Sequence, residues 1–218
     1  MSYQLNCSEF NSQKIIQRIQ QTDLIPSLDC IKTEAETILE KLENKGFDNL
    51  EKIRKALKNK KKLEEIAHEE SIDEKLLILF KREIEGWIVK IRSIDEFEWI
   101  APHYLKKVKE YGIKNSEDAY QKLGDDQSRK KLSQEKKIDN VIVEEIYEIS
   151  NLMRIRWLSP NFTRIIYELQ YTIEKIQKAE HKKLCEEIDD YNKKMKYYKG
   201  KIGERDVKRI IFESQFVK

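Results

Sequence analysis

The sequence predicts an all-α fold, and three observations support this expectation. The chain has 218 residues but only six glycines and three prolines, so the residues that interrupt helices are scarce. Charged residues make up 38% of the chain, and Lys, Glu, Leu and Ile are abundant. Hydrophobic residues make up a further 39%, which is enough to form a hydrophobic core.

The cysteines and the apolar runs indicate the compartment. Cys7, Cys30 and Cys185 are odd in number, lie far apart and follow no signal-peptide-like start, which disfavours a disulfide scaffold. The longest apolar run, "LLILF" at 76–80, ends at Lys81 and is too short to span a membrane. We therefore expect no membrane insertion and a reducing intracellular compartment, either the cytoplasm or an organelle stroma.

The net charge of +3 is unevenly distributed along the chain. Residues 153–218 carry 16 Lys and Arg against 10 Asp and Glu, a net charge of +6, whereas the remainder carries −3. A basic C-terminal third is typical of proteins with an acidic partner such as nucleic acid. The isoelectric point of about 8.5 is lower than is usual for a dedicated nucleic-acid-binding domain.

A short motif occurs three times and indicates an internal repeat. The copies are "LDCIK" at 28–32, "FEWIA" at 97–101 and "IRWLS" at 155–159, each with Cys or Trp between a charged and an aliphatic residue. Each copy precedes a segment with apolar residues every three or four positions, which predicts an amphipathic helix. These residues are Ala35, Ile38, Leu39 and Leu42, then Tyr104, Leu105, Val108 and Tyr111, then Phe162, Ile165, Ile166 and Leu169.

A second pair of matching segments follows the first two motifs. "KGFDNLEKI" parallels "YGIKNSEDA", and Gly46 and Gly112 fit the left-handed backbone position that ends a helix. We expect Asn49 and Ser116 to cap the helices that follow.

The last matching set opens a predicted long helix in each copy. It comprises "SIDEKLLILF", "KIDNVIVEEI" and "KIGERDVKRII". Asp73 and Asp139 are the expected N-caps of the first two helices, whereas Gly203 breaks this pattern in the third. The spacing of the matching segments gives a period of about 65 residues.

The repeat divides the chain into a capping helix and three units. Each unit is expected to contain a short hairpin, an amphipathic helix, a polar turn, one or two short helices and a long helix that leads into the next hairpin. We expect the units to stack in one array, because each buries a face that its neighbour completes. The predicted boundaries are 1–21 for the capping helix, then 22–90, 91–152 and 153–218 for the three units, the last including the C-terminal tail.

These motifs resemble a known type of unit. The motif and the helix after it, with its pattern "A/Y-x-x-L-x-x-x-G-[IF]", resemble the helix-hairpin-helix unit. The junction "LMRIRWLSPNFTRIIYEL" more closely resembles an uncharacterised prokaryotic and plastid-type family, a domain of unknown function built from tandem helix-hairpin-helix-like units. This resemblance covers most of residues 22–212; it implies an all-helical fold and assigns no reaction. The fold class that we expect is therefore all-α, with three tandem helix-hairpin-helix-like repeats.

The predicted hairpins differ from those of helix-hairpin-helix modules that bind DNA. Such modules place glycines in the hairpin so that backbone N–H groups approach a phosphate. Larger residues stand at those positions here, and each proline removes an N–H donor. We therefore expect Trp99 and Trp157 to be core wedges between units, with base stacking as the alternative. The residues assigned to the structural hairpins are Cys30, Trp99, Pro102, Trp157 and Pro160.

The most suggestive surface is the segment "YNKKMKYYKGK" at 191–201, where tyrosines and lysines can stack on bases and neutralise phosphates. The interpretation that we favour is an amphipathic helix with Tyr191, Met195 and Tyr198 on its buried face and the lysines outside. The candidate nucleic-acid-binding residues are Lys182, Lys183, Lys193, Lys194, Lys196, Tyr197, Lys199, Arg205, Lys208 and Arg209.

No sequence motif indicates a catalytic, metal or cofactor site. His181 and Cys185 stand one helical turn apart, but a metal site needs three or four ligands. The sequence contains no phosphate-binding loop, dinucleotide-binding glycine pattern or nucleophile elbow. We expect no enzyme and no cofactor, but a helical-repeat binding or scaffold protein with an unidentified protein partner. The alternative is sequence-nonspecific DNA or RNA binding through the basic, Tyr-rich C-terminal unit.

Overall fold

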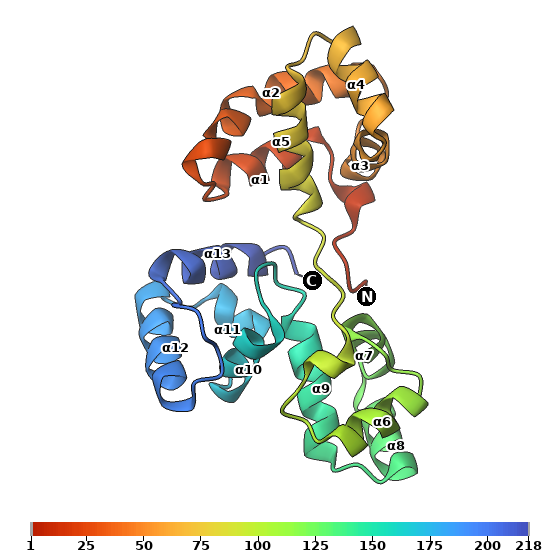
Figure 1. Cartoon of the computed structure of the whole chain (residues 1–218), viewed down its shortest axis with the longest axis vertical. Coiled ribbons are helices and arrows are strands. Elements are labelled where there is room, and N and C mark those ends of the chain that lie inside the picture. Colours follow the sequence, from red (N-terminus) through yellow and green to blue (C-terminus); the bar gives the residue numbers. More distant parts are fainter. Residues whose placement is uncertain (1, 218) are drawn as a thin grey trace. The chain divides into compact units, whose positions relative to one another are not determined.

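The computed structural model describes residues 2–217, and this part of the chain confirms the predicted all-α fold. It contains thirteen α-helices, three short 3-10 helices and no β-strand (Figure 1). Residues 2–217 divide into two compact bodies, which we describe separately. The N-terminal body is Leu5–Ile88, and the C-terminal body comprises residues 2–4 and 89–217.

The N-terminal body has five α-helices around one hydrophobic core. They are α1 (Ser12–Gln21), α2 (Asp29–Asn44), α3 (Leu50–Lys58), α4 (Lys60–Glu69) and α5 (Glu74–Glu85), with the 3-10 helices η1 (Cys7–Glu9) and η2 (Pro26–Leu28). Helix α1 packs against α2, and α5 packs against α2, α3 and α4. Ile15 and Ile19 of α1 are fully buried, because apolar residues four positions apart share one helix face.

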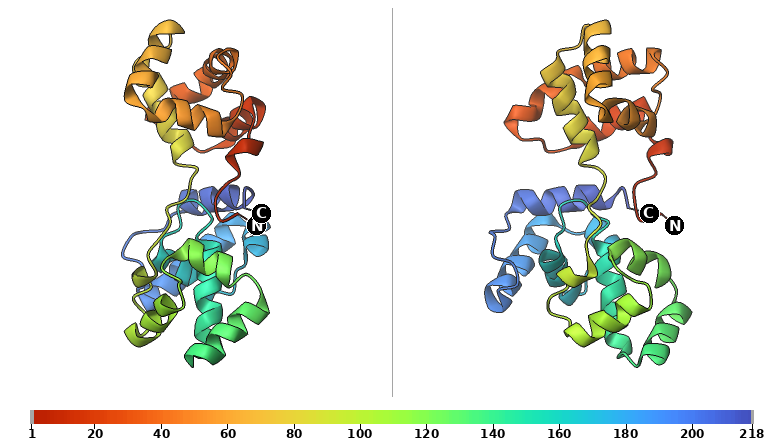
Figure 2. Two further views of the ribbon diagram at one scale, coloured as in Figure 1. Left: turned by 90° about the vertical axis from the view of Figure 1, so that its right-hand side faces the viewer. Right: turned by 45° about the vertical axis from the view of Figure 1, so that its right-hand side comes forward.

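The C-terminal body has eight α-helices around two hydrophobic clusters. The helices are α6 (Pro102–Glu110), α7 (Ser116–Lys122), α8 (Asp126–Lys136), α9 (Asn140–Leu152), α10 (Pro160–Glu168), α11 (Ile173–Gln177), α12 (His181–Met195) and α13 (Glu204–Ser214), preceded by the 3-10 helix η3 (Ile94–Glu96). One cluster lies among η3 and α6–α9, and the other among α10–α13. Helix α9 packs against α7 and α8 and also against α10, so it joins the two clusters (Figures 1 and 2).

Residues 2–4 are held in the C-terminal body by side-chain contacts. The Tyr3 hydroxyl donates to Ser116 Oγ at 2.8 Å, and the Tyr3 ring centroid lies 5.7 Å from that of Tyr120. Gln4 Nε2 donates to the carbonyl oxygen of Val89 at 2.9 Å. Burial is the main cause that raises the pKa of Tyr3 to about 12.

Three tight turns share one backbone geometry. Gly46 and Gly112 have φ angles of +82° and +90°, which confirms the predicted left-handed positions, and Gln170 has a φ of +62°. Each is followed by an apolar residue whose backbone N–H donates to a carbonyl oxygen near the end of the preceding helix. The pairs are Phe47 N–H to Leu42 O, Ile113 N–H to Val108 O, and Tyr171 N–H to Ile166 O. The sequence comparison missed the third turn because glutamine stands there in place of glycine.

An Asn or Thr side chain caps the helix after each of these turns. Asn49 accepts the N–H of the third residue after it, as predicted, and Thr172 caps α11 in the same way. The second cap is Asn115, which corrects the prediction of Ser116. Asn115 has the extended backbone that an N-cap requires, whereas Ser116 is the first helical residue and its hydroxyl accepts from Tyr3.

The N-caps of the long helices agree with the sequence pattern. The Asp73 and Asp139 carboxylates accept backbone N–H groups in the first turns of α5 and α9, which confirms both predictions. Gly203 precedes α13 and has no capping side chain. Asp206 instead accepts the backbone N–H of Gly203 at 3.0 Å.

The predicted hairpins need correction. Cys30 lies in the first turn of α2 and is exposed, so residues 28–32 form the start of a helix and not a hairpin. Residues 97–101 and 155–159 are irregular junctions that end at Pro102 and Pro160. Each proline is the first residue of a helix, where proline is favoured because that backbone N–H has no partner within the helix.

Candidate functional site

Trp157, in the junction between α9 and α10, is the most unusual side chain of the C-terminal body. It is 52% exposed, which corrects the prediction that it is a core wedge, whereas Trp87 is 2% exposed. Its backbone φ is +79°, in the left-handed region that costs a non-glycine residue on the order of 1–3 kcal/mol. Neighbouring residues Ile155 and Leu158 are buried, so the junction itself is anchored while the indole faces solvent.

Two arginines lie beside the Trp157 indole. The guanidinium carbon of Arg156 is 4.1 Å from the ring centroid, and that of Arg209, on α13, is 5.7 Å from it. Arg156 is itself buried and lies 3.5 Å from the buried Glu213 carboxylate. A cation over an indole is attractive, so these contacts hold the exposed ring in place.

Trp99 occupies the corresponding junction before α6 but is half-buried. Its ring stacks on Phe97 with centroids 5.4 Å apart, and the guanidinium carbon of Arg164 lies 5.0 Å from its ring centroid. The indole Nε1 donates to Glu145 Oε1 at 2.6 Å. Burial raises the pKa of Glu145, while this hydrogen bond and the charge of Arg164 act in the opposite direction.

Arg164 contacts one tyrosine of the basic segment directly and is linked to a second through Glu168. Its guanidinium carbon lies 3.8 Å from the Tyr197 ring centroid, and its Nε donates to Glu168 at 2.8 Å. The Tyr191 hydroxyl donates to Glu168, and this bond is the main cause that raises the pKa of Tyr191 to about 12. Tyr197, a candidate for base stacking, therefore packs within the C-terminal body.

The favoured interpretation of residues 191–201 needs one correction. Tyr191 and Tyr198 are half-buried against the cluster of α10–α13, as that interpretation expected. Met195 is 37% exposed, because α12 ends there and the chain turns at Lys196 with a φ of +58°. The helical spacing used in the prediction therefore stops three residues before Tyr198.

The candidate basic residues are spread over distant parts of α12 and α13. Lys182 and Lys183 lie at the start of α12, whereas Lys193 and Lys194 lie near its end. These positions are on the order of 15 Å apart along the helix. Arg205, Lys208 and Arg209 lie on α13, and Lys196 and Lys199 lie in the loop after α12.

Carboxylates lie close to several of these lysines. Lys193 Nζ is 2.6 Å from Asp189, and this contact raises the pKa of Lys193. Lys208 Nζ is 2.7 Å from Glu204, and Lys183 Nζ is 3.9 Å from Glu187. Within residues 2–217, Lys194, Lys196 and Lys199 are exposed and have no ion-pair partner. Lys182 at the start of α12 is likewise exposed and without an ion-pair partner, so three of these four candidate lysines lie around the loop after α12.

The C-terminal part of the chain matches a known protein family. A family model described as "Domain of unknown function (DUF4332)" matches residues 98–215, more than half of the chain and α6–α13 in full. The chain belongs to this family. No curated protein and no solved structure gave a match.

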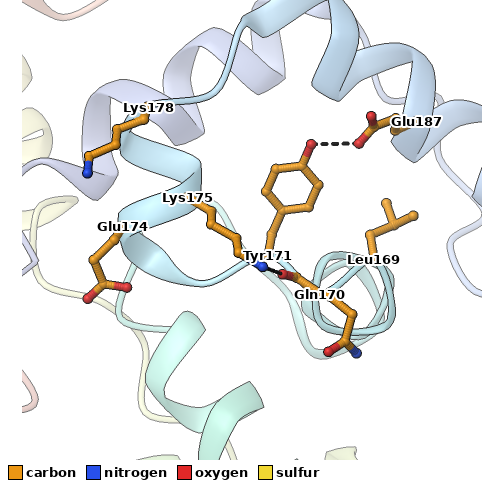
Figure 3. Close-up of a pocket in the computed structure, with 7 residues that line it drawn as sticks. All are labelled: Leu169, Gln170, Tyr171, Glu174, Lys175, Lys178 and Glu187. Carbon is orange, nitrogen blue, oxygen red and sulfur yellow. Dashed lines mark hydrogen bonds between the residues drawn. The ribbon is translucent and has the colours of Figure 1, made fainter.

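The DUF4332 region contains a shallow depression of about 490 Å³ beside α11 and α12 (Figure 3). The Tyr171 hydroxyl donates to Glu187 Oε2 at 2.6 Å, and Lys175 Nζ donates to the carbonyl oxygen of Gln170 at 2.7 Å. Burial is the main cause that raises the pKa of Tyr171 to about 12, so this hydroxyl is a neutral donor at neutral pH. The remaining lining residues are Leu169, Glu174 and Lys178.

His181 and Cys185, also in the DUF4332 region, have other surroundings. His181 Nδ1 lies 3.1 Å from Glu204 Oε1, and burial raises the pKa of the Cys185 thiol. Among residues 2–217, no group of three or more His, Cys, Asp or Glu side chains is placed to hold a metal ion. Over the same residues, every helix is too short or too polar to cross a bilayer.

Outside the DUF4332 region, the N-terminal body has a groove of about 480 Å³ between α2 and α5. Lys41 also lines this groove, and its Nζ donates to the carbonyl oxygen of Glu70 at 2.7 Å. The groove is partly apolar, since four aliphatic side chains contribute to it. These are Ile38, Ile72, Leu76 and Leu79.

Proposed function

We propose that this chain is a non-catalytic helical-repeat protein that acts as a scaffold by binding another protein. Its three units are helix-hairpin-helix-like and comprise α2–α5, α6–α9 and α10–α13. Two observations support this repeat: the left-handed turns and the residues that precede the long helices recur every 58 to 66 residues. Helix α1 packs on α2 as α9 packs on α10, so α1 takes the place of the last helix of an incomplete unit.

The exposed indole of Trp157 carries the proposal that the partner is a protein. Trp and Arg are the residues most enriched among those that dominate protein–protein binding energy. Here an anchored junction presents a tryptophan to solvent and two arginines flank it. The fixed position of the ring lowers the entropy that binding must remove.

Nucleic-acid binding through the C-terminal unit is the second candidate function. One observation favours it, the exposed and unpaired ammonium groups of Lys194, Lys196 and Lys199 around one loop. Two observations disfavour it: Tyr197 packs on Arg164, and carboxylates lie beside Lys193 and other candidate lysines.

A salt titration separates the two functions. Fluorescence anisotropy with labelled single- and double-stranded DNA is measured from low to physiological salt. If the partner is a protein, we expect no salt-sensitive micromolar binding. Binding that weakens steeply with salt, and that is lost when Lys194, Lys196 and Lys199 are changed to Glu, would overturn the protein-binding proposal. The same change to Glu at Lys58, Lys61 and Lys130, which are exposed and lie outside the loop after α12, is the matched control and is not expected to abolish such binding.

A further inference from the structure

The chain connects the N-terminal body to the C-terminal body at two places. The N-terminal body is Leu5–Ile88, and residues 2–4 and 89–217 both belong to the C-terminal body. The chain therefore crosses between the bodies at 4–5 and again at 88–89. The crossing at 4–5 restrains the N-terminal body only while residues 2–4 stay docked.

A buried hydrogen-bond network holds residues 2–4. The Tyr3 side chain is 2% exposed, and its hydroxyl donates to Ser116 Oγ at 2.8 Å. Ser116, on α7, is fully buried and also accepts the backbone N–H of Arg92 at 3.1 Å. Arg154 Nη2 donates to the carbonyl oxygen of Ser2 at 3.4 Å. Tyr3 is therefore the central contact of this segment.

Gln4 links the two crossings to each other. Its Nε2 donates to the carbonyl oxygen of Val89 at 2.9 Å. Gln4 is the last residue before the first crossing, and Val89 is the first residue after the second. This bond keeps the two crossings together at the edge of the C-terminal body, and it is lost if residues 2–4 detach.

The DUF4332 region forms the site that Tyr3 occupies, whereas Tyr3 itself lies outside that region. The Tyr3 ring centroid is 5.7 Å from that of Tyr120, and the guanidinium carbon of Arg154 is 4.3 Å from the Tyr120 centroid. Ser116, Tyr120 and Arg154 all lie within residues 98–215. A docked segment of three residues can open locally at a lower free energy than global unfolding requires.

We propose that residues 2–4 form a releasable latch that restricts the motion of the N-terminal body relative to the C-terminal body. With Tyr3 docked, the N-terminal body is tethered at both of its ends. With Tyr3 released, it is tethered only at 88–89 and reorients about that link, since a few residues at a chain crossing can act as a hinge. The latch goes beyond the proposed scaffold function and does not depend on the identity of a partner.

Distance measurement between two spin labels by pulsed electron paramagnetic resonance tests the latch in the full chain. One label is attached at Glu40→Cys in α2 and the other at Lys131→Cys in α8, both exposed positions. The native cysteines are replaced by alanine at Cys7, Cys30 and Cys185. We expect a narrower distance distribution with Tyr3 present than in Tyr3→Ala. Loss of a buried aromatic side chain shifts such an equilibrium by more than about a hundredfold, so the released state becomes the main one.

Two further variants accompany Tyr3→Ala. Tyr104→Ala is the matched control, because it removes a half-buried ring of α6 in the same body and outside the latch. It is expected to leave the distance distribution unchanged. Tyr3→Phe keeps the ring and removes only the bond to Ser116. It is expected to raise the fraction of the broad component about twofold to tenfold, and it decides the question if Tyr3→Ala does not fold.

Three results overturn the latch. They are a distribution that is as broad with Tyr3 present as in Tyr3→Ala, a distribution that neither change at Tyr3 alters, and a broadening in Tyr104→Ala equal to that in Tyr3→Ala. Circular dichroism of each variant shows whether its helices are retained. The salt titration with DNA is independent of these distances, so the proposed function and the latch are tested separately.

Discussion

Trp99→Phe removes the indole N–H that donates to Glu145. It keeps an aromatic ring that can contact Phe97 and Arg164. The bond from Trp99 Nε1 to Glu145 Oε1 is 2.6 Å long, and both side chains are half-buried. A carboxylate that loses a partner in such surroundings costs about 1–3 kcal/mol. Solvent has partial access to Glu145, so we expect a loss of about 1–2 kcal/mol in the free energy of unfolding at neutral pH.

The cost of Trp99→Phe is expected to depend on pH. Burial raises the folded-state pKa of Glu145 above its ordinary value of 4.5, so ionisation of Glu145 destabilises the folded state above that folded pKa. Stability is regained as the pH falls through the folded pKa towards the unfolded value. In the unmodified chain, the hydrogen bond from Trp99 lowers the pKa of Glu145. Loss of this bond therefore raises the folded-state pKa of Glu145 further in the variant. The difference between variant and unmodified chain is therefore largest at neutral pH and smaller near pH ~4.

Urea unfolding followed by far-ultraviolet circular dichroism measures this difference at the two pH values. The same substitution in a Glu145→Gln background is the control, since the amide oxygen accepts the indole N–H and carries no charge. In that background we expect an equal cost at both pH values. The reasoning is refuted if the cost in the Glu145 background is also independent of pH, or if it is close to zero at neutral pH.

Three other predictions concern the C-terminal body. Gln170→Gly is expected to raise the free energy of unfolding by about 1 kcal/mol, because glycine adopts the φ of +62° without strain, whereas Gly112→Ala is expected to lower it by a similar amount. Changes of the same sign in urea unfolding would contradict this. Asn115→Ala is expected to cost about 1 kcal/mol through loss of the α7 cap, measured as a lower thermal midpoint, and an unchanged midpoint would argue against the cap. Tyr3 is expected to keep its proton at pH ~11 in an ultraviolet titration, so stability falls as the pH rises above the unfolded pKa of 10.0 towards about 12, and Tyr3→Phe is expected to reduce that fall.

Local features of the fold could be predicted from the sequence because they depend on neighbouring residues alone. Glycine is favoured at left-handed positions and Asp at N-caps, so Gly46, Gly112, Asp73 and Asp139 were placed correctly. Where another residue type fills the same role, the signal is weak, as at Gln170.

The surroundings of the two junction tryptophans could not be predicted from the motif. "EWIAP" and "RWLSP" are nearly alike, yet Trp99 is half-buried and Trp157 is exposed. The difference comes from residues far away in sequence, since Glu145 and Arg164 hold Trp99 while Arg209 faces Trp157. One signal in the sequence was that Arg209 of α13 stands at the position that matches Glu145 of α9.

The contact between Tyr3 and Ser116 sets an order of events during synthesis on the ribosome. The hydroxyl group and its acceptor are 113 residues apart in sequence, with the whole N-terminal body between them. At ordinary rates of translation, the acceptor emerges about 6–23 s after the tyrosine. The N-terminal body has been synthesised by then. Residues 2–4 therefore cannot make their contacts with α7 until that helix has formed. The docking of Tyr3 therefore depends on the formation of α7 and is expected to be a late step in folding.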